Sequence, residues 1–281
     1  MQIIRRLSDL DLLTAHWCAE DEQFALVPTM GALHDGHLAL IEEGKRHAPR
    51  VAATIFVNPL QFNDKADLER YPRNEEADLA KLEAAGCDAV WLPTVEELYP
   101  EGFATTVSVK GVSDRWEGEH RPGHFDGVAT VVAKLLIGTR PNFAVFGEKD
   151  WQQLAVIRRL ERDLGIGVTI IGHPTIRESD GLAMSSRNAL LTPEDRSNAA
   201  SLPRSLNYLA SAIIGGEPVA SAVNRCIDAL KADGFGPIDY VAYVDGESLE
   251  PLDRHQEGGR LIAAAFLGKV RLIDNIPVAL N

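Results

Sequence analysis

The chain has 281 residues, of which 45% are hydrophobic and 25% charged, so it is typical of a globular protein and is not a disordered, collagen-like or fibrous chain. Lys and Arg number 28 against 41 Asp and Glu, and the formal net charge of −13 argues against a general binder of nucleic acid or anionic membranes. Small anionic ligands need only a local cluster of positive charge, so they stay within the range of expected partners.

The cysteines and the N-terminus indicate a cytoplasmic protein. Cys18, Cys87 and Cys226 are odd in number and far apart, which matches neither a disulfide framework nor a zinc site. Met1–Arg6 has no apolar run behind its basic pair, so we expect no signal peptide. No stretch approaches the ~18 apolar residues of a membrane span.

Up to about residue 175, apolar runs alternate with helical patterns. Strands alternating with helices form βαβ units, which build a parallel sheet covered on both faces. The sequence therefore predicts a doubly wound, Rossmann-like α/β fold. The predicted strands are 24–28, 51–57, 89–92, 105–109, 142–146 and 168–172, and the predicted helices are 37–46, 75–85, 128–137 and 151–164.

Beyond residue 176 the pattern changes. Consecutive helical patterns are followed by short apolar runs typical of a meander. We therefore predict a domain of residues 1–175 that contains the parallel sheet, and a smaller α+β domain of residues 176–281. The helices expected in the smaller domain are 193–215 and 218–234, and the strands are 238–244, 260–266 and 270–273.

Polar, glycine-bearing segments follow several of the predicted strands. In an open parallel sheet, ligands bind beyond the carboxyl ends of the strands. Segments 28–37, 56–63 and 147–153 fall at such ends, and 180–188 lies at the domain boundary. Because independent loops do not usually all carry such clusters, the four segments together predict one site.

His34 and His37 lie three residues apart at the start of a predicted helix, with Gly36 between them. The free N–H groups and the positive dipole end of a helix favour an anion, and a glycine lets a phosphate approach the backbone. Two imidazoles could donate hydrogen bonds to phosphate oxygens there. They could also be a pair of metal ligands, or plain surface histidines.

The other segments also have two interpretations. Ser185, Ser186 and Arg187 offer hydroxyl donors and a forked guanidinium for phosphate, or form an ordinary polar loop. Asp150 and Gln153 fit a ligand site, or a helix cap with its reciprocal partner.

The absence of several known motifs limits the kinds of phosphate chemistry that the sequence can support. The sequence has no G-x-x-x-x-G-K-[ST] P-loop and no G-x-S-x-G elbow, and residues 165–170 lack the third glycine of a dinucleotide motif. A histidine pair at a helix start with a distant Ser-Ser-Arg loop points to attack on an α-phosphate rather than kinase chemistry.

Two of these segments resemble the motifs of a known enzyme family. HDGH at 34–37 together with MSSR at 184–187 resembles the paired signatures of the nucleotidylyltransferase superfamily, and more closely those of the pantoate–β-alanine ligase (pantothenate synthetase) family. Leu60 and Trp151 stand where this family leads us to expect methionine and a smaller aromatic residue. The resemblance extends over 28–37, 56–62, 121–135, 146–154, 180–188 and 271–275.

The resemblance implies an ATP-dependent condensation of (R)-pantoate with β-alanine, which gives pantothenate, AMP and pyrophosphate through a pantoyl adenylate, on the way to coenzyme A. It implies Mg²⁺ that arrives with ATP, no metal site of the protein's own, a lid formed by residues 176–281, and a homodimer without nucleic-acid or membrane partners. The alternative is another adenylyl-transferring enzyme on the same scaffold.

The resemblance also implies roles for individual residues. It makes His37, His34 and Lys149 catalytic, with His37 as the candidate acid, and it assigns Gln61, Gln153 and, at the rim, Arg121 to pantoate and β-alanine. The implied ATP-binding residues are Met30, Gly31, Ala32, Leu33, His34, Asp35, Gly36, His37, Gly147, Glu148, Lys149, Asp150, Ile176, Met184, Ser185, Ser186 and Arg187.

Overall fold

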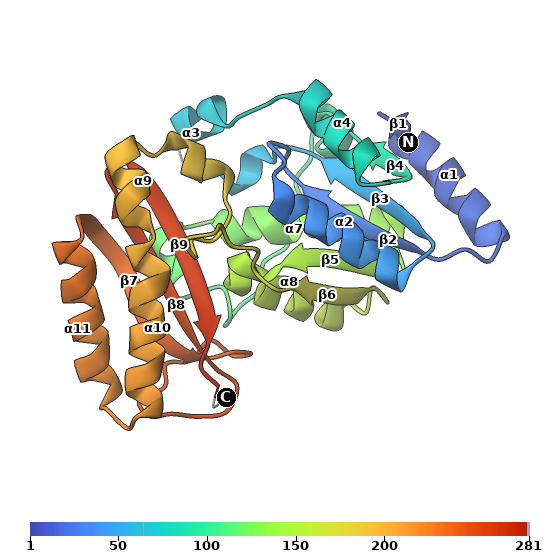
Figure 1. Ribbon diagram of the computed structural model, residues 1–281. Coiled ribbons are helices and arrows are strands. Elements are labelled where there is room, and N and C mark those ends of the chain that lie inside the picture. The colour runs from blue at the N-terminus through green and yellow to red at the C-terminus, as the bar shows by residue number, and fades with distance from the viewer. Residues whose placement is uncertain (64, 280–281) are drawn as a thin grey trace.

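The structure is a computed structural model that describes residues 1–63 and 65–279. Its larger sheet has six strands in the order β1-β4-β3-β2-β5-β6, and every pairing is parallel (Figure 1). The strands are β1 (Gln2–Ile4), β2 (Phe24–Thr29), β3 (Arg50–Ile55), β4 (Ala89–Trp91), β5 (Phe143–Gly147) and β6 (Thr169–His173).

Helices cover both faces of this sheet, as the doubly wound prediction requires. On one face, α1 (Leu7–Ala19), α7 (His124–Thr139) and α8 (Trp151–Leu164) contribute Leu10, Leu136 and Leu154 to one buried cluster. On the other face, α2 (Asp35–His47) and α4 (Glu75–Ala84) contribute Ile41 and Leu82 to a second. Fully buried strands flanked by helices on both sides explain the nearly continuous apolar runs in the sequence.

The C-terminal residues form a separate sheet with a core of its own. Its antiparallel strands β7, β8 and β9 are covered by α10 and α11, in orange and red in Figure 1. The expected smaller α+β unit is therefore present. The elements are α9 (Pro193–Ala199), α10 (Ser201–Ile214), α11 (Val219–Ala232), β7 (Phe235–Asp245), β8 (Gly259–Leu267) and β9 (Val270–Pro277).

Short helical turns connect the main elements. Several of them lie near the carboxyl ends of β3 and β5 and carry residues of the site described below. They are η1 (Pro59–Gln61), α3 (Lys65–Arg70), α5 (Val95–Leu98), α6 (Glu117–His120), η2 (Glu148–Asp150) and η3 (Ser186–Leu190).

The structure corrects two element predictions and contains elements that were not predicted. Residues 105–109, all described, form no strand, because the Val107 N–H donates to Thr130 Oγ1 on α7 instead of to a neighbouring strand. The single helix expected at 193–215 is two helices, since Pro203 cannot follow on from α9 without a clash with the carbonyl four residues earlier. The elements that were not predicted are α1, β1 and the short helical turns between the main elements.

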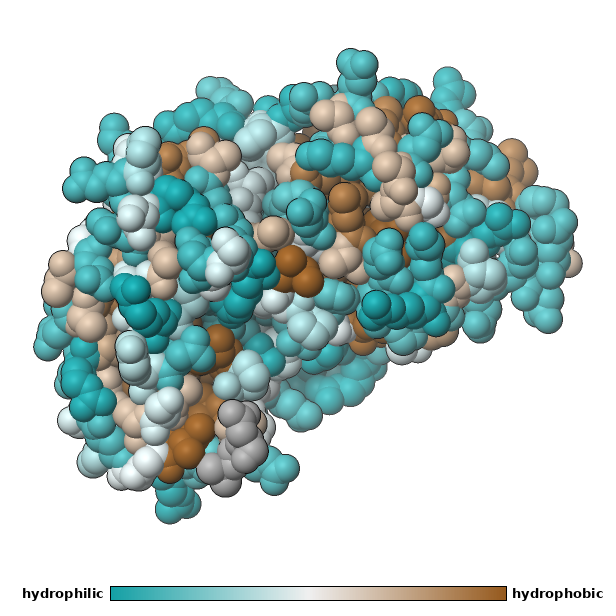
Figure 2. Space-filling model, in the orientation of Figure 1, coloured by the Kyte–Doolittle hydropathy of each residue, from teal (hydrophilic) through white to brown (hydrophobic). Residues whose placement is uncertain are grey.

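The described residues contain no helix long and apolar enough to cross a membrane. On the face shown in Figure 2, hydrophilic residues cover most of both units and hydrophobic residues gather only in small groups. This surface is consistent with the charged, ordinary composition of the chain.

Candidate functional site

A cavity of about 230 Å³ lies beyond the carboxyl ends of β2 and β5. The remaining strands extend away from this pair in opposite directions, so β2 and β5 flank the point where the strand order reverses. Ligands of doubly wound folds bind at such a point.

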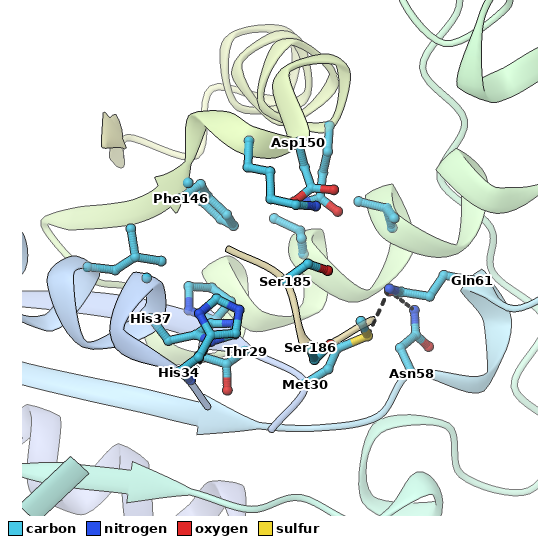
Figure 3. Close-up of a pocket in the computed structure, with 18 of the residues that line it drawn as sticks. Thr29, Met30, His34, His37, Asn58, Gln61, Phe146, Asp150, Ser185 and Ser186 are labelled. Atoms are coloured by element: carbon cyan, nitrogen blue, oxygen red, sulfur yellow. Dashed lines mark hydrogen bonds and ion pairs between the residues drawn. The ribbon is translucent and has the colours of Figure 1, made fainter. Parts of the chain in front are cut away.

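The four polar segments predicted to form one site do meet at this cavity. Figure 3 shows the rings of His34 and His37 on one side, Asp150 and Ser185 opposite them, and Gln61 at one end. The predicted residues that line the cavity are Met30, His34, Gly36, His37, Gln61, Arg121, Gly147, Lys149, Asp150, Gln153, Ile176, Met184, Ser185, Ser186 and Arg187.

Five of the predicted ATP-binding residues are absent from the described cavity wall: Gly31, Ala32, Leu33, Asp35 and Glu148. Leu33 is 2% exposed and belongs to the core beneath α2. The Glu148 carboxylate lies 3.4 Å from Arg260 of the C-terminal unit.

A buried carboxylate shapes the loop after β2. The two oxygens of Asp78, on α4, accept hydrogen bonds from the N–H groups of Ala32 and Leu33, each at 2.8 Å. Gly31 has φ +80°, and a Cβ there would lie 3.0 Å from Asp78 Oδ2, so this backbone favours glycine. Asp78 therefore fixes the turn that carries His34 to the start of α2.

The two histidines form a fixed pair. The His34 N–H donates to His37 Nδ1 at 3.2 Å, and the ring centroids are 4.1 Å apart. Since Nδ1 of His37 accepts a hydrogen bond, the neutral ring carries its proton on Nε2. His37 is thus held as a neutral donor.

Burial and neighbouring charges keep both rings neutral. Burial, with smaller contributions from His34, Lys149 and Lys81, lowers the pKa of His37 from 6.5 to about 3. Burial and Lys149 also lower the pKa of His34. Nδ1 of His34 is buried and has no hydrogen-bond partner within residues 1–63 and 65–279. A site of this kind suits an anion that supplies acceptors for these rings.

A chain of hydrogen bonds orients Gln61. The Tyr99 hydroxyl donates to Asn58 Oδ1 at 2.8 Å, and Asn58 Nδ2 donates to Gln61 Oε1 at 3.0 Å. The Gln61 amide nitrogen in turn lies 3.0 Å from Met30 Sδ, as the dashed lines of Figure 3 show. Because the carbonyl of this amide is occupied, its NH₂ group is the part available to a ligand.

Arg121 lies at the rim, next to the same segment. Its guanidinium donates to the Gln61 carbonyl at 3.3 Å and lies 3.3 Å from the Glu117 carboxylate. Burial lowers the pKa of Arg121, against the attraction of Glu117. Arg271 also pairs with Glu117, with Nη1 donating at 2.9 Å, so Glu117 neutralises neither guanidinium fully.

The capping interpretation of Asp150 and Gln153 is wrong. Asp150 precedes α8, but its side chain accepts no capping hydrogen bond from any described residue. Both side chains line the cavity instead, and Lys149 Nζ lies 3.9 Å from Asp150 Oδ2.

The loop that closes the far side of the cavity is held by hydrogen bonds between its own residues. The Met184 N–H donates to the Ile176 carbonyl at 2.9 Å. Ser185 Oγ accepts from the Arg187 N–H at 3.2 Å. Asn188 donates to Glu178 at 2.7 Å, which anchors the turn after the Ser-Ser-Arg run.

Comparisons with known proteins identify the family of this chain. Residues 2–277 match the family described as pantoate-beta-alanine ligase. A pantothenate synthetase of Rhizorhabdus wittichii is 54% identical over 278 residues, or 99% of each chain, and one of Rhodospirillum rubrum is 52% identical over 279 residues, again 99% of each. The chain belongs to the pantoate–β-alanine ligase family.

Solved structures of this ligase family have the same fold. A pantothenate synthetase from Thermus thermophilus superposes with a TM-score of 0.94 at 47% identity, with full coverage of both chains. A ligase from Francisella tularensis, solved in complex with beta-gamma ATP and β-alanine, superposes with a TM-score of 0.85 at 32% identity over 100% of this chain and 99% of that one.

Neither of the two departures from the expected ligase motif is among the described residues that line the cavity. Leu60 is 46% exposed. The Trp151 ring lies under the Arg260 guanidinium, 3.3 Å from the ring centroid, and its indole N–H donates to the Gly246 carbonyl at 2.8 Å.

Several lining residues were missed by sequence reasoning. Asn58 stands in the predicted loop 56–63 and His124 in the motif segment 121–135, so both could have been found there, whereas Tyr71 lies outside every motif segment. Part of the apolar wall comes from helix α7, whose buried face looked like ordinary core. The lining residues outside the predicted set include Thr29, Phe56, Asn58, Phe62, Tyr71, His124, Val128, Val131, Phe146 and His173.

Proposed function

We propose that this cavity joins (R)-pantoate to β-alanine in two half-reactions. In the first, a pantoate carboxylate oxygen attacks the α-phosphorus of ATP, the bond to the bridging oxygen breaks, and pyrophosphate leaves. In the second, the β-alanine amine attacks the acyl carbon, loses a proton, and AMP leaves. One observation carries the proposal: the phosphate-type donors and the amides of Gln61 and Gln153 line one cavity.

His37 acts in this scheme as a neutral hydrogen-bond donor. With a pKa of about 3, it is not an imidazolium at neutral pH, so it has no spare proton for an acid role in the free protein. Its Nε2–H can donate to a phosphate oxygen as negative charge develops there. A preorganised donor of this kind in a water-poor site stabilises a transition state strongly.

Lys149 and Arg187 supply positive charge around the same phosphates, and the start of α2 adds its free N–H groups. These groups offset the charge of ATP and of the departing pyrophosphate. Reaction by this route requires positioning and charge stabilisation, with no covalent intermediate on the protein. The lack of a nucleophile motif in the sequence fits such a route.

The other end of the cavity suits pantoate. Gln61 and Gln153 offer amide groups for its hydroxyls and carboxylate, while Val128 and Val131 provide an apolar wall for its two methyl groups. ATP would then lie between the histidine pair and the loop of Ile176 and Met184–Arg187. The unit of residues 176–281 would act as a lid that keeps water from the adenylate.

Mg²⁺ would bind mainly through the phosphates of ATP. The described residues hold no group of three or more His, Cys, Asp or Glu that could bind a metal, and Asp150 is the only carboxylate among the lining residues described. Mg²⁺ commonly takes one or two carboxylates plus phosphate oxygens and waters, so Asp150 fits as its protein ligand. The ion would neutralise charge on the phosphates.

We also propose a homodimer in the cytoplasm. Leu12 on α1 is 73% exposed and Ile137 on α7 is 56% exposed, and the two helices pack together on the sheet domain. Light scattering after size-exclusion chromatography tests the dimer. The three cysteines are free, as expected in a reducing compartment.

Exchange of labelled pyrophosphate into ATP tests the first half-reaction by itself. With β-alanine absent, exchange should require both (R)-pantoate and Mg²⁺, because it reverses formation of the adenylate. Exchange that is indifferent to pantoate would contradict the proposed substrate. The alternative, an enzyme that leaves the nucleotide in its product, would release no AMP when the second substrate is added.

A further inference from the structure

Strand β9 carries two adjacent buried polar side chains, Asp274 and Asn275, which are 2% and 4% exposed. Neighbouring side chains on a strand point to opposite faces. Asp274 shares its face with Leu272 and Ile276, which pack in the core of the C-terminal unit. Asn275 faces the other way, toward the sheet domain.

The two side chains hold the two loops of the nucleotide site. Asp274 accepts a bidentate pair from Arg177 at 2.8 and 2.9 Å, next to Ile176 of the cavity wall. Asn275 Nδ2 donates to the backbone carbonyls of Glu148 at 2.9 Å and of Lys149 at 2.8 Å. A single strand of the C-terminal unit thus connects both loops.

The Asn275 amide is itself fixed. Its oxygen accepts a hydrogen bond from Arg260 on the neighbouring strand β8. The same guanidinium lies 3.4 Å from the Glu148 carboxylate and stacks 3.3 Å from the centroid of the Trp151 ring. The amide therefore has one orientation, with its NH₂ group toward the turn Glu148–Asp150.

We propose that Asn275 is a positioning residue, which ties the placement of Lys149 to docking of the C-terminal unit. Lys149 lines the cavity with its side chain, while its own carbonyl is held from the opposite side by Asn275. Loss of the donor frees this turn from β9 and lets the ammonium leave its place. The role of Lys149 toward ATP rests on the proposed function.

The sharpest test is a double-mutant cycle with Lys149. Asn275→Asp keeps an oxygen that can accept from Arg260, but it replaces the donor with a carboxylate oxygen and adds a negative charge. Asn275→Ala removes the donor and the acceptor without adding charge. Asn207→Ala is the control, because the exposed Asn207 side chain makes one hydrogen bond to a described residue, to the Pro203 carbonyl at 2.8 Å within the same C-terminal unit. Isothermal titration with Mg-ATP alone, without pantoate, gives the dissociation constant of each variant.

We expect both Asn275 variants to weaken ATP binding roughly 10- to 100-fold, the scale for loss of a hydrogen bond to a charged group. In a Lys149→Ala background the same changes should alter binding by less than about twofold, since their target is gone. Asn207→Ala should change binding by less than about twofold in both backgrounds. Equal losses from the Asn275 variants in both backgrounds, or no loss in either, would overturn the proposal.

Hydrogen exchange of the ligand-free protein separates this proposal from the proposed function. Peptides that contain residues 147–151 should exchange faster in both Asn275 variants than in wild type and in Asn207→Ala. Unchanged exchange there overturns the positioning role whether or not ATP binds. If the wild-type chain binds no ATP, the proposed function is refuted. Faster exchange in the Asn275 variants would still support a role for Asn275 in positioning this turn.

Discussion

A single added methyl group at Gly36 should strongly reduce activity. A Cβ at this residue would lie 2.9 Å from both Cε1 and Nδ1 of the His34 ring. Ordinary contact between such atoms is about 3.5–4.0 Å, so Gly36→Ala must move the ring by roughly 0.6–1.1 Å. Because the ring is the end of a flexible side chain, it can move without a shift of the backbone, so we expect Gly36→Ala to fold.

The expected loss follows from this displacement. A misplacement of about 1 Å can cost about 100-fold in rate, or roughly 2.7 kcal/mol of transition-state stabilisation. The free energy of unfolding should not fall, because Ala favours a helix over Gly by up to about 1 kcal/mol. We therefore expect pantoate-dependent pyrophosphate exchange to fall about 100-fold while the midpoint of thermal unfolding is unchanged or higher.

Two controls isolate the cause. Gly138→Ala adds the same methyl group in α7, where it would meet Leu7 at 3.5 and 3.6 Å, an ordinary contact, so activity should stay at the wild-type level. In a His34→Ala background, Gly36→Ala should cost little further, because no ring is left to displace. An exchange rate for Gly36→Ala within about threefold of wild type would refute this reasoning, as would the full loss in both backgrounds.

The remaining predictions concern the histidines and Gln153. His37→Ala should slow adenylate formation about 100- to 1,000-fold with the fold intact, measured by single-turnover quench; near-normal adenylation would remove His37 from the mechanism. Gln153→Ala should raise the KM for pantoate far more than that for ATP without lowering the unfolding midpoint, and a fall in the midpoint alone would point to a structural role. Burial lowers the pKa of His37 to about 3 and, with Arg121, that of His124 to about 4. Below pH 6.5 these histidines become protonated in the unfolded chain before they do in the native one, so the unfolding free energy should fall from pH 6.5 to 4.5. Denaturant titrations at several pH values measure this fall. The unfolding free energy of His124→Asn should depend less steeply on pH, and an equal dependence would contradict the buried, neutral state of His124.

The strong local patterns made most of the fold predictable. The largely apolar runs 24–28 and 51–57 correspond to the buried strands β2 (Phe24–Thr29) and β3 (Arg50–Ile55), and helix α8 (Trp151–Leu164) begins and ends where the sequence predicts. Residues 105–109 alternate like a strand, but Val107 and Val109 are apolar because they pack on the large core. Alternation alone does not tell whether a neighbouring strand is present to pair with them.

The site was predictable where residues act through their own side chains. The loops of His34, Lys149 and Ser185 follow strands and carry recognisable clusters. Asp78 was missed because its partners, the N–H groups of Ala32 and Leu33, are 45 and more residues away and belong to the backbone. Asn275 was noticed only as part of a motif, since its contact with the Lys149 turn depends on how the two units pack.

Product analysis is the most direct test of the proposed reaction. The protein is mixed with Mg-ATP and (R)-pantoate, with and without β-alanine, and the nucleotides and acids are separated. Sustained release of AMP and pyrophosphate together with pantothenate, only when β-alanine is present, is the result we predict. Formation of ADP, or an adenylylated product that accumulates without release of AMP, would contradict attack on the α-phosphate followed by amide formation.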